Sequence, residues 1–485
     1  MSSSAPQAAA PPIDRHTVIT AFVLIAGGLA VIFDSTIVSI ALDTLARELD
    51  VTVGTIQWVS TGYLLALGVA IPLVGWAQAR VGGKRLWMIA LAVFGLASIA
   101  CSLAWDAPSL IAFRVVQGLG GGIMMPLMAT LVIQQAGGAG DGLGRVMALV
   151  SLPTALGPIL GPTIGGAILH SLSWPWLFWV NVPFCVVGLL LAWRFLPADG
   201  PTGRPRLDVV GLALLSPGLA GLLYGLSNVS KAGGFGRFDV WGPAGAGLLL
   251  VAAFVAWSVP RPERALVDVR LLGRRAVGSS ATLFILSAAS LYGAMLLLPL
   301  YFQNVRGMTA LQAGVVLIPQ GVGTLLSRVT AGRLTDTVGA RWVAFVGFGV
   351  LGLATIPFAY ADASTSQWWL MGVLLVRGVG LGAVVIPVMS VAFIGLDRGE
   401  VPHASIITRL AQQLGGAFGT AILAVILEAN LARANDTAGV AAAFDTAFWW
   451  AVGFTVVAMA LAFLLPAKPN APAPVSPPPV PAVRS

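Results

Sequence analysis

The chain has 485 residues, of which 57% are hydrophobic and only 9% are charged. Soluble domains carry about 25% charged residues, so this composition excludes an ordinary soluble protein and indicates a chain that crosses a membrane many times. The formal net charge of +8 would fit a nucleic-acid-binding protein, but the placement of the charges argues against that class.

About 20 apolar residues cross a bilayer as a helix. This rule predicts an all-α membrane protein with fourteen transmembrane helices, near residues 17–41, 56–78, 86–104, 108–133, 146–169, 176–196, 207–229, 240–259, 276–303, 311–332, 342–361, 367–392, 404–430 and 444–466.

Lys and Arg residues gather on one side of these predicted spans. Outside the spans, the exceptions are Arg47, Lys231, Arg237, Arg306 and Arg433. Because basic loops stay in the cytoplasm, this bias predicts a multi-pass protein of the plasma or inner membrane with both termini cytoplasmic. The basic charge is therefore an orientation signal, and no nucleic-acid partner is expected.

Polar residues and glycines recur through the first half of the chain. In chain order they are Phe33 and Asp34 in the first span, Gln57, Trp58 and Tyr63 in the second, a glycine turn at 75–85 with Gly75, Gly82 and Arg85, Arg114 and Gln117 in the fourth span, and Asn181 in the sixth.

The fifth span is unusually rich in glycine and proline. Gly157, Gly161 and Gly165 recur every four residues, which predicts one smooth face against which another helix can pack closely. The prolines remove backbone donors and bend the helix. The complete pattern comprises Gly157, Pro158, Gly161, Pro162, Gly165 and Gly166. Plain small-residue packing is the alternative reading of the glycine spacing.

Part of the first-half pattern returns later. The turn at 332–341, with Asp336, Gly339 and Arg341, echoes 75–85, and Arg377 followed by glycines echoes Arg114. Such parallel repeats predict two six-helix bundles with two inserted helices. The predicted regions are a disordered cytoplasmic N-terminus at 1–16, an N-terminal bundle at 17–196, a linker with two extra spans at 197–275, a C-terminal bundle at 276–466 and a disordered Pro-rich cytoplasmic tail at 467–485.

Together these motifs resemble the fourteen-helix drug:proton antiporter family of the major facilitator superfamily. The resemblance covers residues from Asp34 to about Gly419, and it includes Arg409-x-x-Gln-Gln-Leu-Gly415-Gly416. It implies the major facilitator fold, and it identifies the fifth span as the family's antiporter motif. It also implies a conformational gating role for Gly75, Gly82, Arg85, Asp336, Gly339, Arg341, Arg377 and Arg409.

One residue departs from the family pattern. The first glycine turn of the family usually has an Asp where this chain has Ala79. The resemblance implies that this acid pins the turn to neighbouring helices. The first half lacks the acid, whereas Asp336 supplies it in the second half.

Ionisable residues inside a membrane are costly and are therefore candidate functional sites. Asp34, Arg114 and Glu428 are the predicted proton-coupling residues: a buried carboxylate can take up a proton, and a movement that separates it from a neighbouring Arg would change its proton affinity. Alternatively, Asp34 is a structural cap or an interhelical bond, Arg114 ties two helices together, and Glu428 lies at a solvated helix end.

Aromatic and amide side chains could form a cavity for flat lipophilic molecules. The predicted substrate-binding residues are Phe33, Gln57, Trp58, Tyr63, Asn181, Tyr292, Tyr301, Gln303 and Gln320. No phosphate-binding loop, metal-ligand spacing or hydrolase triad occurs, so no enzyme activity, metal or cofactor is expected.

These observations predict a monomeric, proton-coupled exporter of lipophilic drugs or antibiotics, and the scarcity of membrane acids favours neutral or monocationic substrates. The expected partners are the small-molecule substrate, protons and the lipid bilayer. A dedicated exporter of one antibiotic, metabolite or lipid, an importer or facilitator, and a non-transporting sensor or scaffold are the alternatives.

Overall fold

The computed structural model describes residues 15–136, 147–148, 151, 157, 161, 164–169, 171–200, 203, 206–229, 237–262, 264–362, 364–397, 399–434 and 436–466. These residues are helical with short connections, and they contain no β-strand. The longer helices are α1 (Arg15–Glu48), α2 (Val53–Ala70), α4 (Gly83–Ser102), α5 (Ala107–Gln135), α8 (Asn181–Phe195), α9 (Val209–Ser227), α10 (Phe238–Ser258), α11 (Arg275–Asn304), α12 (Ala310–Thr337), α13 (Ala340–Thr355), α14 (Gln367–Val391), α15 (Val401–Leu431) and α16 (Thr437–Leu461). The short helices α3 (Val74–Val81) and α7 (Trp176–Trp179) precede α4 and α8.

Twelve helices within this described part are long and apolar enough to cross a membrane. They correspond to twelve of the fourteen predicted spans. The predicted span at 146–169 lies mostly outside the described residues. The span predicted at 311–332 lies in α12, which has 28 residues but is not among the twelve. Its sequence includes Gln312, Gln320, Arg328, Arg333 and Asp336, and these polar groups lower its hydropathy.

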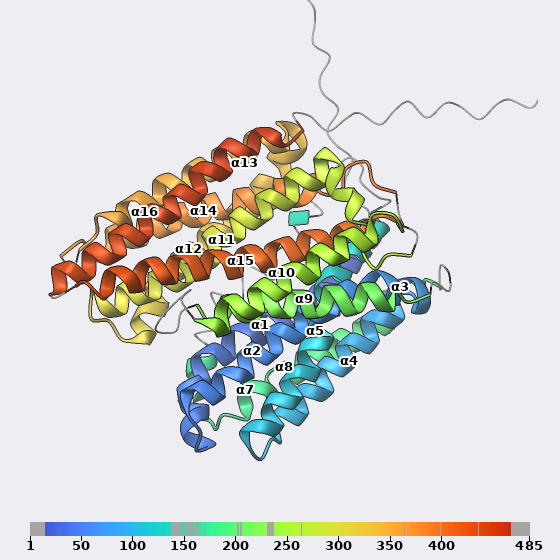
Figure 1. The fold of residues 1–485 in the computed structure, drawn as a ribbon, viewed down its shortest axis with the longest axis horizontal. Helices are drawn as coiled ribbons and strands as arrows, with labels where there is room; N and C mark the ends of the chain where they lie inside the picture. Colours follow the sequence, from blue (N-terminus) through green and yellow to red (C-terminus); the bar gives the residue numbers. More distant parts are fainter. Residues whose placement is uncertain are drawn as a thin grey trace, which may run out of the picture.

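The helices form two lobes (Figure 1). α1–α8 make the blue-to-green lobe, and α11–α16 make the yellow-to-red lobe. The same helix pairs pack in each: α2 against α5 and α4 against α5 and α8 in the first lobe, and α12 against α14 and α13 against α14 and α16 in the second. The internal repeat therefore extends from sequence motifs to helix packing.

Glycines allow the closest of these contacts. On α5, a Cβ at Gly118 or Gly122 would overlap the backbone carbonyl of Tyr63 or Leu67 on α2. On α14, a Cβ at Gly378 would overlap the backbone carbonyl of Gln320 on α12, and one at Gly382 would overlap the Ser327 hydroxyl. Small residues at such spacing let helix backbones pack tightly where no hydrophobic effect drives association.

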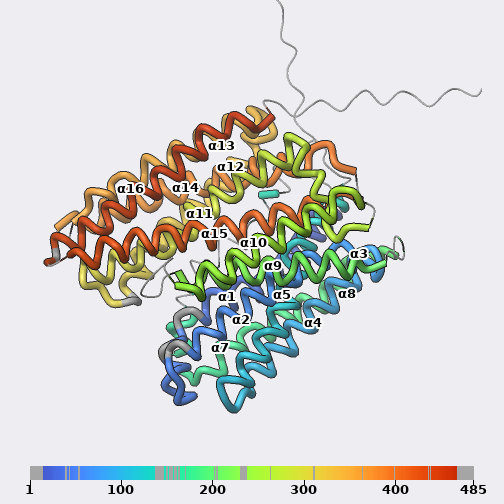
Figure 2. The backbone as a smooth tube through the Cα atoms, in the orientation of Figure 1, coloured from blue at the N-terminus to red at the C-terminus, as the bar shows by residue number. Residues whose placement is uncertain are grey.

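The two inserted helices, α9 and α10, pack against each other and lie between the lobes (Figure 2). α9 contacts α2 through a stacked pair, Tyr224 and Trp58, with ring centroids 5.5 Å apart. The same end of α9 packs near Ala421 of α15, in an apolar cluster with Leu226 and Val229. The inserted pair therefore bridges the two lobes.

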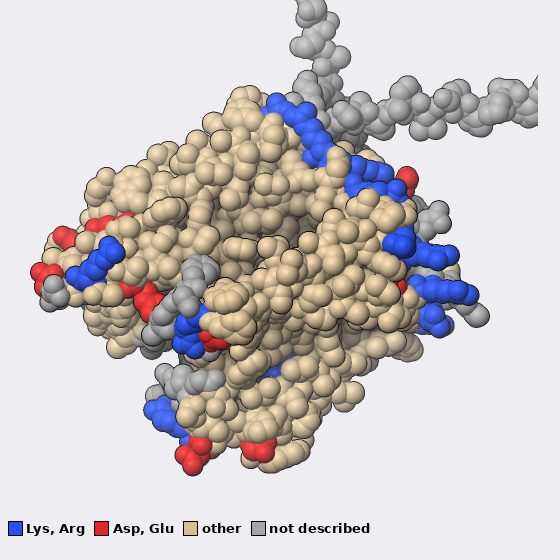
Figure 3. Space-filling model, in the orientation of Figure 1, with Lys and Arg blue, Asp and Glu red and all other residues tan. Residues whose placement is uncertain are grey.

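Basic side chains gather at one end of the molecule, on the right in Figure 3. We call this the basic end; it comprises the turn between α3 and α4, the segment joining α10 to α11 and the start of α13. The lobes touch here, because Thr130 of α5 and Ser405 of α15 are hydrogen-bonded through their hydroxyl groups at 2.9 Å. A Cβ at Gly75 of α3 would lie 3.7 Å from both Pro402 and Ile406.

Candidate functional site

Asp34 is the most deeply buried acid among the described residues of the first lobe. It lies on α1, it is completely inaccessible to solvent, and its Oδ2 is 2.5 Å from Nη1 of Arg114 on α5. Charge-assisted hydrogen bonds of this kind are about twice as strong as neutral ones. Two of the three predicted proton-coupling residues, 80 positions apart in the sequence, thus form a buried ion pair.

A polar network surrounds the Asp34 carboxylate. The side-chain amides of Gln117 and Asn181 donate to its Oδ1 at 3.0 and 2.9 Å, and both also donate to the hydroxyl of Ser98. Arg114 also donates to the Gln117 carbonyl oxygen at 2.7 Å and to the backbone carbonyl of Val59 at 3.1 Å. The site therefore joins α1, α2, α4, α5 and α8, and a change at Asp34 would act on all five helices.

Aromatic rings cover the Arg114 guanidinium. Its Cζ lies 4.0 Å from the ring centroid of Tyr63 and 5.8 Å from that of Phe178. A cation is attracted to such ring faces, and the attraction grows when water is excluded. Tyr63, predicted as a substrate contact, is 1% exposed, and its hydroxyl has no hydrogen-bond partner among the described residues. Tyr63 and Asn181 therefore belong to the surroundings of the ion pair.

The second lobe holds an equivalent arginine without an acid. Arg377 of α14 is 1% exposed and donates to Oε1 of Gln320 at 2.7 Å and to Oγ1 of Thr355 at 3.1 Å. Both acceptors are neutral, and within the described part of the chain Arg377 forms no ion pair. The two lobes thus repeat the arginine but not the carboxylate.

A scan against protein-family models matches the Major Facilitator Superfamily over residues 24–420. That match covers more than half of the chain. The chain belongs to the major facilitator superfamily. The superfamily predicted from the motifs is confirmed, whereas the fourteen-helix subdivision stays a prediction.

Relatives in this superfamily are named for drug resistance. The chain is 38% identical to a multidrug resistance protein B homolog of Mycobacterium tuberculosis, over 84% of this chain and 76% of that protein. It is 29% identical to the lincomycin resistance protein LmrB of Listeria monocytogenes, over 87% of this chain and 89% of that protein. The solved structure of the proton:xylose symporter XylE superposes with a TM-score of 0.62 at 15% identity, covering 93% of this chain and 96% of that one, and it supports the fold alone. The chain is therefore a multi-pass membrane transporter with multidrug efflux relatives.

The glycines of the predicted antiporter motif face the helix that carries Asp34. A Cβ at Gly157 would overlap Ile32, one at Gly161 would overlap Thr36, and one at Gly165 would lie 3.3 Å from the backbone carbonyl of Ile37. Gly166 faces open space, and Pro158 and Pro162 lie outside the described residues. The motif thus packs on the turn of α1 around Asp34, so a bend in the helix that carries the motif would displace α1 at the ion pair.

The other predicted substrate contacts are separated by the fold. Trp58, Tyr292 and Gln57 are exposed, and Gln303 is partly buried. Phe33 is 4% exposed and packs against Phe184, and Gln320 is held by Arg377. Tyr301 is fully buried among Phe302, Phe358, Phe444 and Phe448, and its hydroxyl donates to the backbone carbonyl of Asp362 at 3.1 Å.

Several other predicted residues lie away from the Asp34 network. Glu428 is partly buried near the far end of α15, and it forms no ion pair with a described residue. Arg341 donates to the backbone carbonyl of Leu465 at 2.9 Å, and Arg85 is exposed. No group of three or more His, Cys, Asp or Glu side chains in the described part of the chain could hold a metal ion.

The two predicted glycine turns share a backbone conformation. Gly82 has φ +88° and Gly339 has φ +103°, a region that favours glycine, and each residue stands directly before a helix. Each turn therefore needs its glycine to reverse the chain at the basic end.

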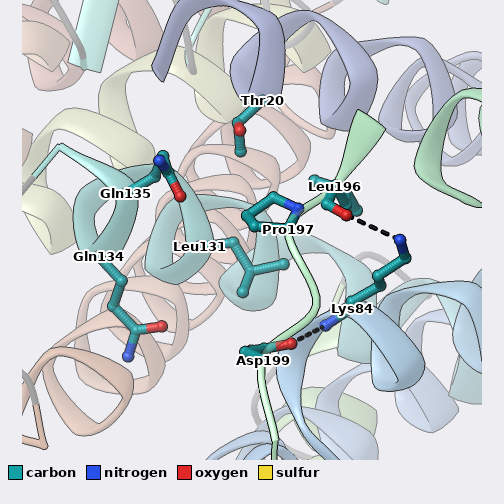
Figure 4. Close-up of a pocket in the computed structure, with 8 residues that line it drawn as sticks. All are labelled: Thr20, Lys84, Leu131, Gln134, Gln135, Leu196, Pro197 and Asp199. Carbon is teal, nitrogen blue, oxygen red and sulfur yellow. Dashed lines mark hydrogen bonds between the residues drawn. The ribbon is translucent and has the colours of Figure 1, made fainter. Parts of the chain in front are cut away.

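Sequence reasoning missed Asp199. This residue follows α8, and its carboxylate accepts a hydrogen bond from the backbone N–H of Gly83 at 2.7 Å. It also accepts one from the backbone N–H of Lys84 at 2.8 Å (Figure 4). It thereby caps the first turn of α4, where backbone donors lack helical partners and the helix dipole favours an anion. An acid beyond the sixth predicted span was the only sequence signal.

The Lys84 side chain also links the start of α4 to the end of α8. Its Nζ donates to the backbone carbonyls of Trp193 at 2.8 Å and Leu196 at 2.7 Å, near the end of α8. Beside it lies a cavity of ≈ 220 Å³ lined by Thr20, Lys84, Leu131, Gln134, Gln135, Leu196, Pro197 and Asp199. The backbone carbonyl of Ala79, where the family pattern has Asp, accepts from the backbone N–H of Gly203 at 3.3 Å. The turn is thus held by the segment after α8.

Proposed function

We propose that this protein is a proton-coupled antiporter that exports lipophilic drugs or antibiotics from the cytoplasm by alternating access. The buried Asp34–Arg114 ion pair carries the proposal. Burying a carboxylate in the core of a membrane protein costs free energy, so a residue retained there is expected to have a functional or structural role. The drug-resistance relatives support export as the direction of transport.

In this proposal the chain has fourteen spans, with α12 and the span at 146–169 added to the twelve apolar helices. Residues 17–196 and 276–466 form two moving bundles, and α9 and α10 join them. The basic end is cytoplasmic, because basic residues are retained on that side. The Thr130–Ser405 contact then closes the cytoplasmic side in this conformation.

The coupling step is the protonation of Asp34. A proton that arrives from the outer side would neutralise the carboxylate and weaken its attraction for Arg114. Arg114 would keep its neutral acceptors, Gln117 and the Val59 carbonyl, while α1 is released from α5 and α8. The bundles would then rock, the cytoplasmic contact would open, and the proton would leave to the inside.

The test uses purified protein in liposomes with an imposed pH gradient and a fluorescent lipophilic substrate. We expect gradient-dependent uptake by the wild type and its loss in Asp34→Asn, with substrate binding retained. Arg433→Gln, which removes an exposed charge, is the matched control. Uptake that ignores the gradient would refute antiport, and coupling that survives Asp34→Asn would move the proton site elsewhere.

A further inference from the structure

The described interior of the second lobe carries positive charge that no acid balances. Arg377 is fully buried, has only neutral acceptors, and its Nη2 has no hydrogen-bond partner in the described part of the chain. In the first lobe, by contrast, Asp34 neutralises Arg114. The lobes therefore differ in buried charge although they repeat in packing.

Arg409 on α15 adds a second uncompensated cation. Its Nη1 donates to Oε1 of Gln412 at 2.5 Å, a neutral acceptor three residues along the same helix. Its Nε is buried without a hydrogen-bond partner, and it forms no ion pair with any described side chain. A buried guanidinium that lacks an anion is unfavourable unless a partner arrives during function.

The position of Arg409 places it between the lobes. It follows Ser405 by one helical turn, so it lies on the same face of α15 as the hydroxyl that contacts Thr130. Tyr292 of α11 packs on this face of α15, because a Cβ at Gly416, about two turns after Arg409, would lie 2.7 Å from the Tyr292 ring. Arg409 is partly buried and Tyr292 is 39% exposed, whereas Arg377 is 1% exposed. Of the two uncompensated arginines, Arg409 is the one that an incoming molecule can reach.

We propose that Arg409, together with Gln412, anchors an acidic group of the exported molecule, so that the preferred substrates are amphipathic organic anions. The Tyr292 ring offers a surface for the apolar body of such a molecule. This inference rests on the proposed export function and specifies the charge of its substrate. It departs from the neutral or monocationic substrates that the sequence favoured, because the sequence does not reveal that Arg409 lacks an acidic partner.

The electrical balance of the exchange fits this assignment. An anion that leaves and a proton that enters both move positive charge inward. A membrane potential that is negative inside therefore favours both movements. Export of a cation in exchange for one proton would gain nothing from that potential.

The test uses three probes that share one aromatic body and differ in charge: pyrenebutyrate, pyrenebutanol and pyrenebutyl-trimethylammonium. Their dissociation constants are measured on the full-length protein in phosphatidylcholine nanodiscs with gluconate as the only small anion. In the wild type we expect the carboxylate to bind most tightly and the ammonium most weakly. Equal affinity for the three, or preference for the ammonium, would overturn the proposal even without a variant.

Variants then assign the preference to Arg409. We expect Arg409→Gln to raise the dissociation constant for pyrenebutyrate about tenfold or more, because a hydrogen bond to a charged group is lost. Pyrenebutanol should change by less than about twofold, and Arg409→Lys should retain part of the preference. Arg433→Gln on the exposed turn after α15 is the control and should leave all three unchanged. An equal loss for all three probes in Arg409→Gln would show a structural role and refute the anchor.

A lipid headgroup or a free inorganic anion could occupy the same guanidinium. The binding assay is therefore repeated with phosphatidylglycerol in the nanodisc and with chloride in place of gluconate. Pyrenebutyrate binding that persists in both supports a substrate site, whereas displacement by either would identify that anion as the occupant and overturn the assignment. Gradient-driven transport of the three probes separates the two proposals, because absence of transport for all three would refute export while a charge-selective Arg409 site would still stand.

Discussion

Asp199 and Gly83 lie 116 residues apart in the sequence, and the Asp199 carboxylate accepts a hydrogen bond from the Gly83 backbone N–H at 2.7 Å. This contact fastens the segment after α8 to the start of α4 at the basic end. It supplies an acid to a turn in which Ala79 replaces the acid of the family pattern. The helix before this turn also contacts the other lobe, since Gly75 of α3 faces Pro402 and Ile406 of α15.

We therefore expect Asp199→Ala to destabilise the α3–α4 turn. Loss of a side chain that accepts from the free N–H groups of a helix N-terminus costs about 0.5–2 kcal/mol, so the thermal unfolding midpoint of the purified protein should fall. Ala79→Asp in the same background would restore part of the loss if an acid at either position can hold the turn. An unfolding midpoint for Asp199→Ala equal to that of the wild type would show that the cap contributes nothing.

The Asp34–Arg114 pair should behave as a coupled unit. Arg114→Gln leaves a buried carboxylate without its cation, and breaking a buried pair in this way costs about 3–5 kcal/mol. The double variant Asp34→Asn/Arg114→Gln removes both charges, so we expect it to be more stable than Arg114→Gln alone. Denaturant unfolding of the four proteins in the cycle measures the coupling. Strictly additive changes would mean that the two side chains act independently.

The hydroxyl contact between the lobes predicts a specific cross-link. Thr130→Cys and Ser405→Cys together should form a disulfide under mild oxidation, because the two hydroxyl oxygens are 2.9 Å apart. The bond should block transport, and reduction should restore it. Each single variant is a control, since the native Cys101 and Cys185 are both buried. Full transport by the cross-linked protein would contradict a cycle in which this contact opens.

Two glycines on α14 offer a matched test of close helix packing. A Cβ at Gly382 would lie 2.5 Å from the backbone carbonyl of Thr324 on α12, whereas nothing lies within 4 Å of a Cβ at Gly372. We expect Gly382→Ala to lower stability by about 1–3 kcal/mol through overpacking. Gly372→Ala should be neutral or stabilising, since Ala is the better helix former. The unfolding midpoints of the two variants make the comparison, and equal midpoints would refute tight packing at Gly382.

The hydropathy of the chain identified most of the fold. Apolar runs are a local property, so twelve spans could be located without any knowledge of packing. The repeat and the superfamily were likewise readable, because glycine turns and intramembrane arginines occupy fixed positions along the chain. Hydropathy is less informative for α12, which carries several polar groups; one of them, Gln320, accepts a hydrogen bond from Arg377.

Local sequence also marked Asp34 and Arg114, because an ionisable residue stands out in an apolar run. It did not determine their partners. Gln117 lies beside Arg114 on α5, but Asn181 lies on α8 and Ser98 on α4, and only the folded arrangement brings the three together around the Asp34 carboxylate. Hydrogen bonds and ion pairs act over a few ångströms, whereas the residues that form this network are separated by up to 147 positions.

The tertiary structure alone decided which charges are balanced. By sequence, Arg114 and Arg377 are equivalent members of a repeat, and Ala79 is a missing acid. In the folded chain Arg114 has a carboxylate, Arg377 and Arg409 have only neutral acceptors, and Asp199 holds the turn beside Ala79. Composition and periodicity record which groups a chain contains, but the electrostatic free energy of a group depends on what lies within a few ångströms of it, and only packing determines that.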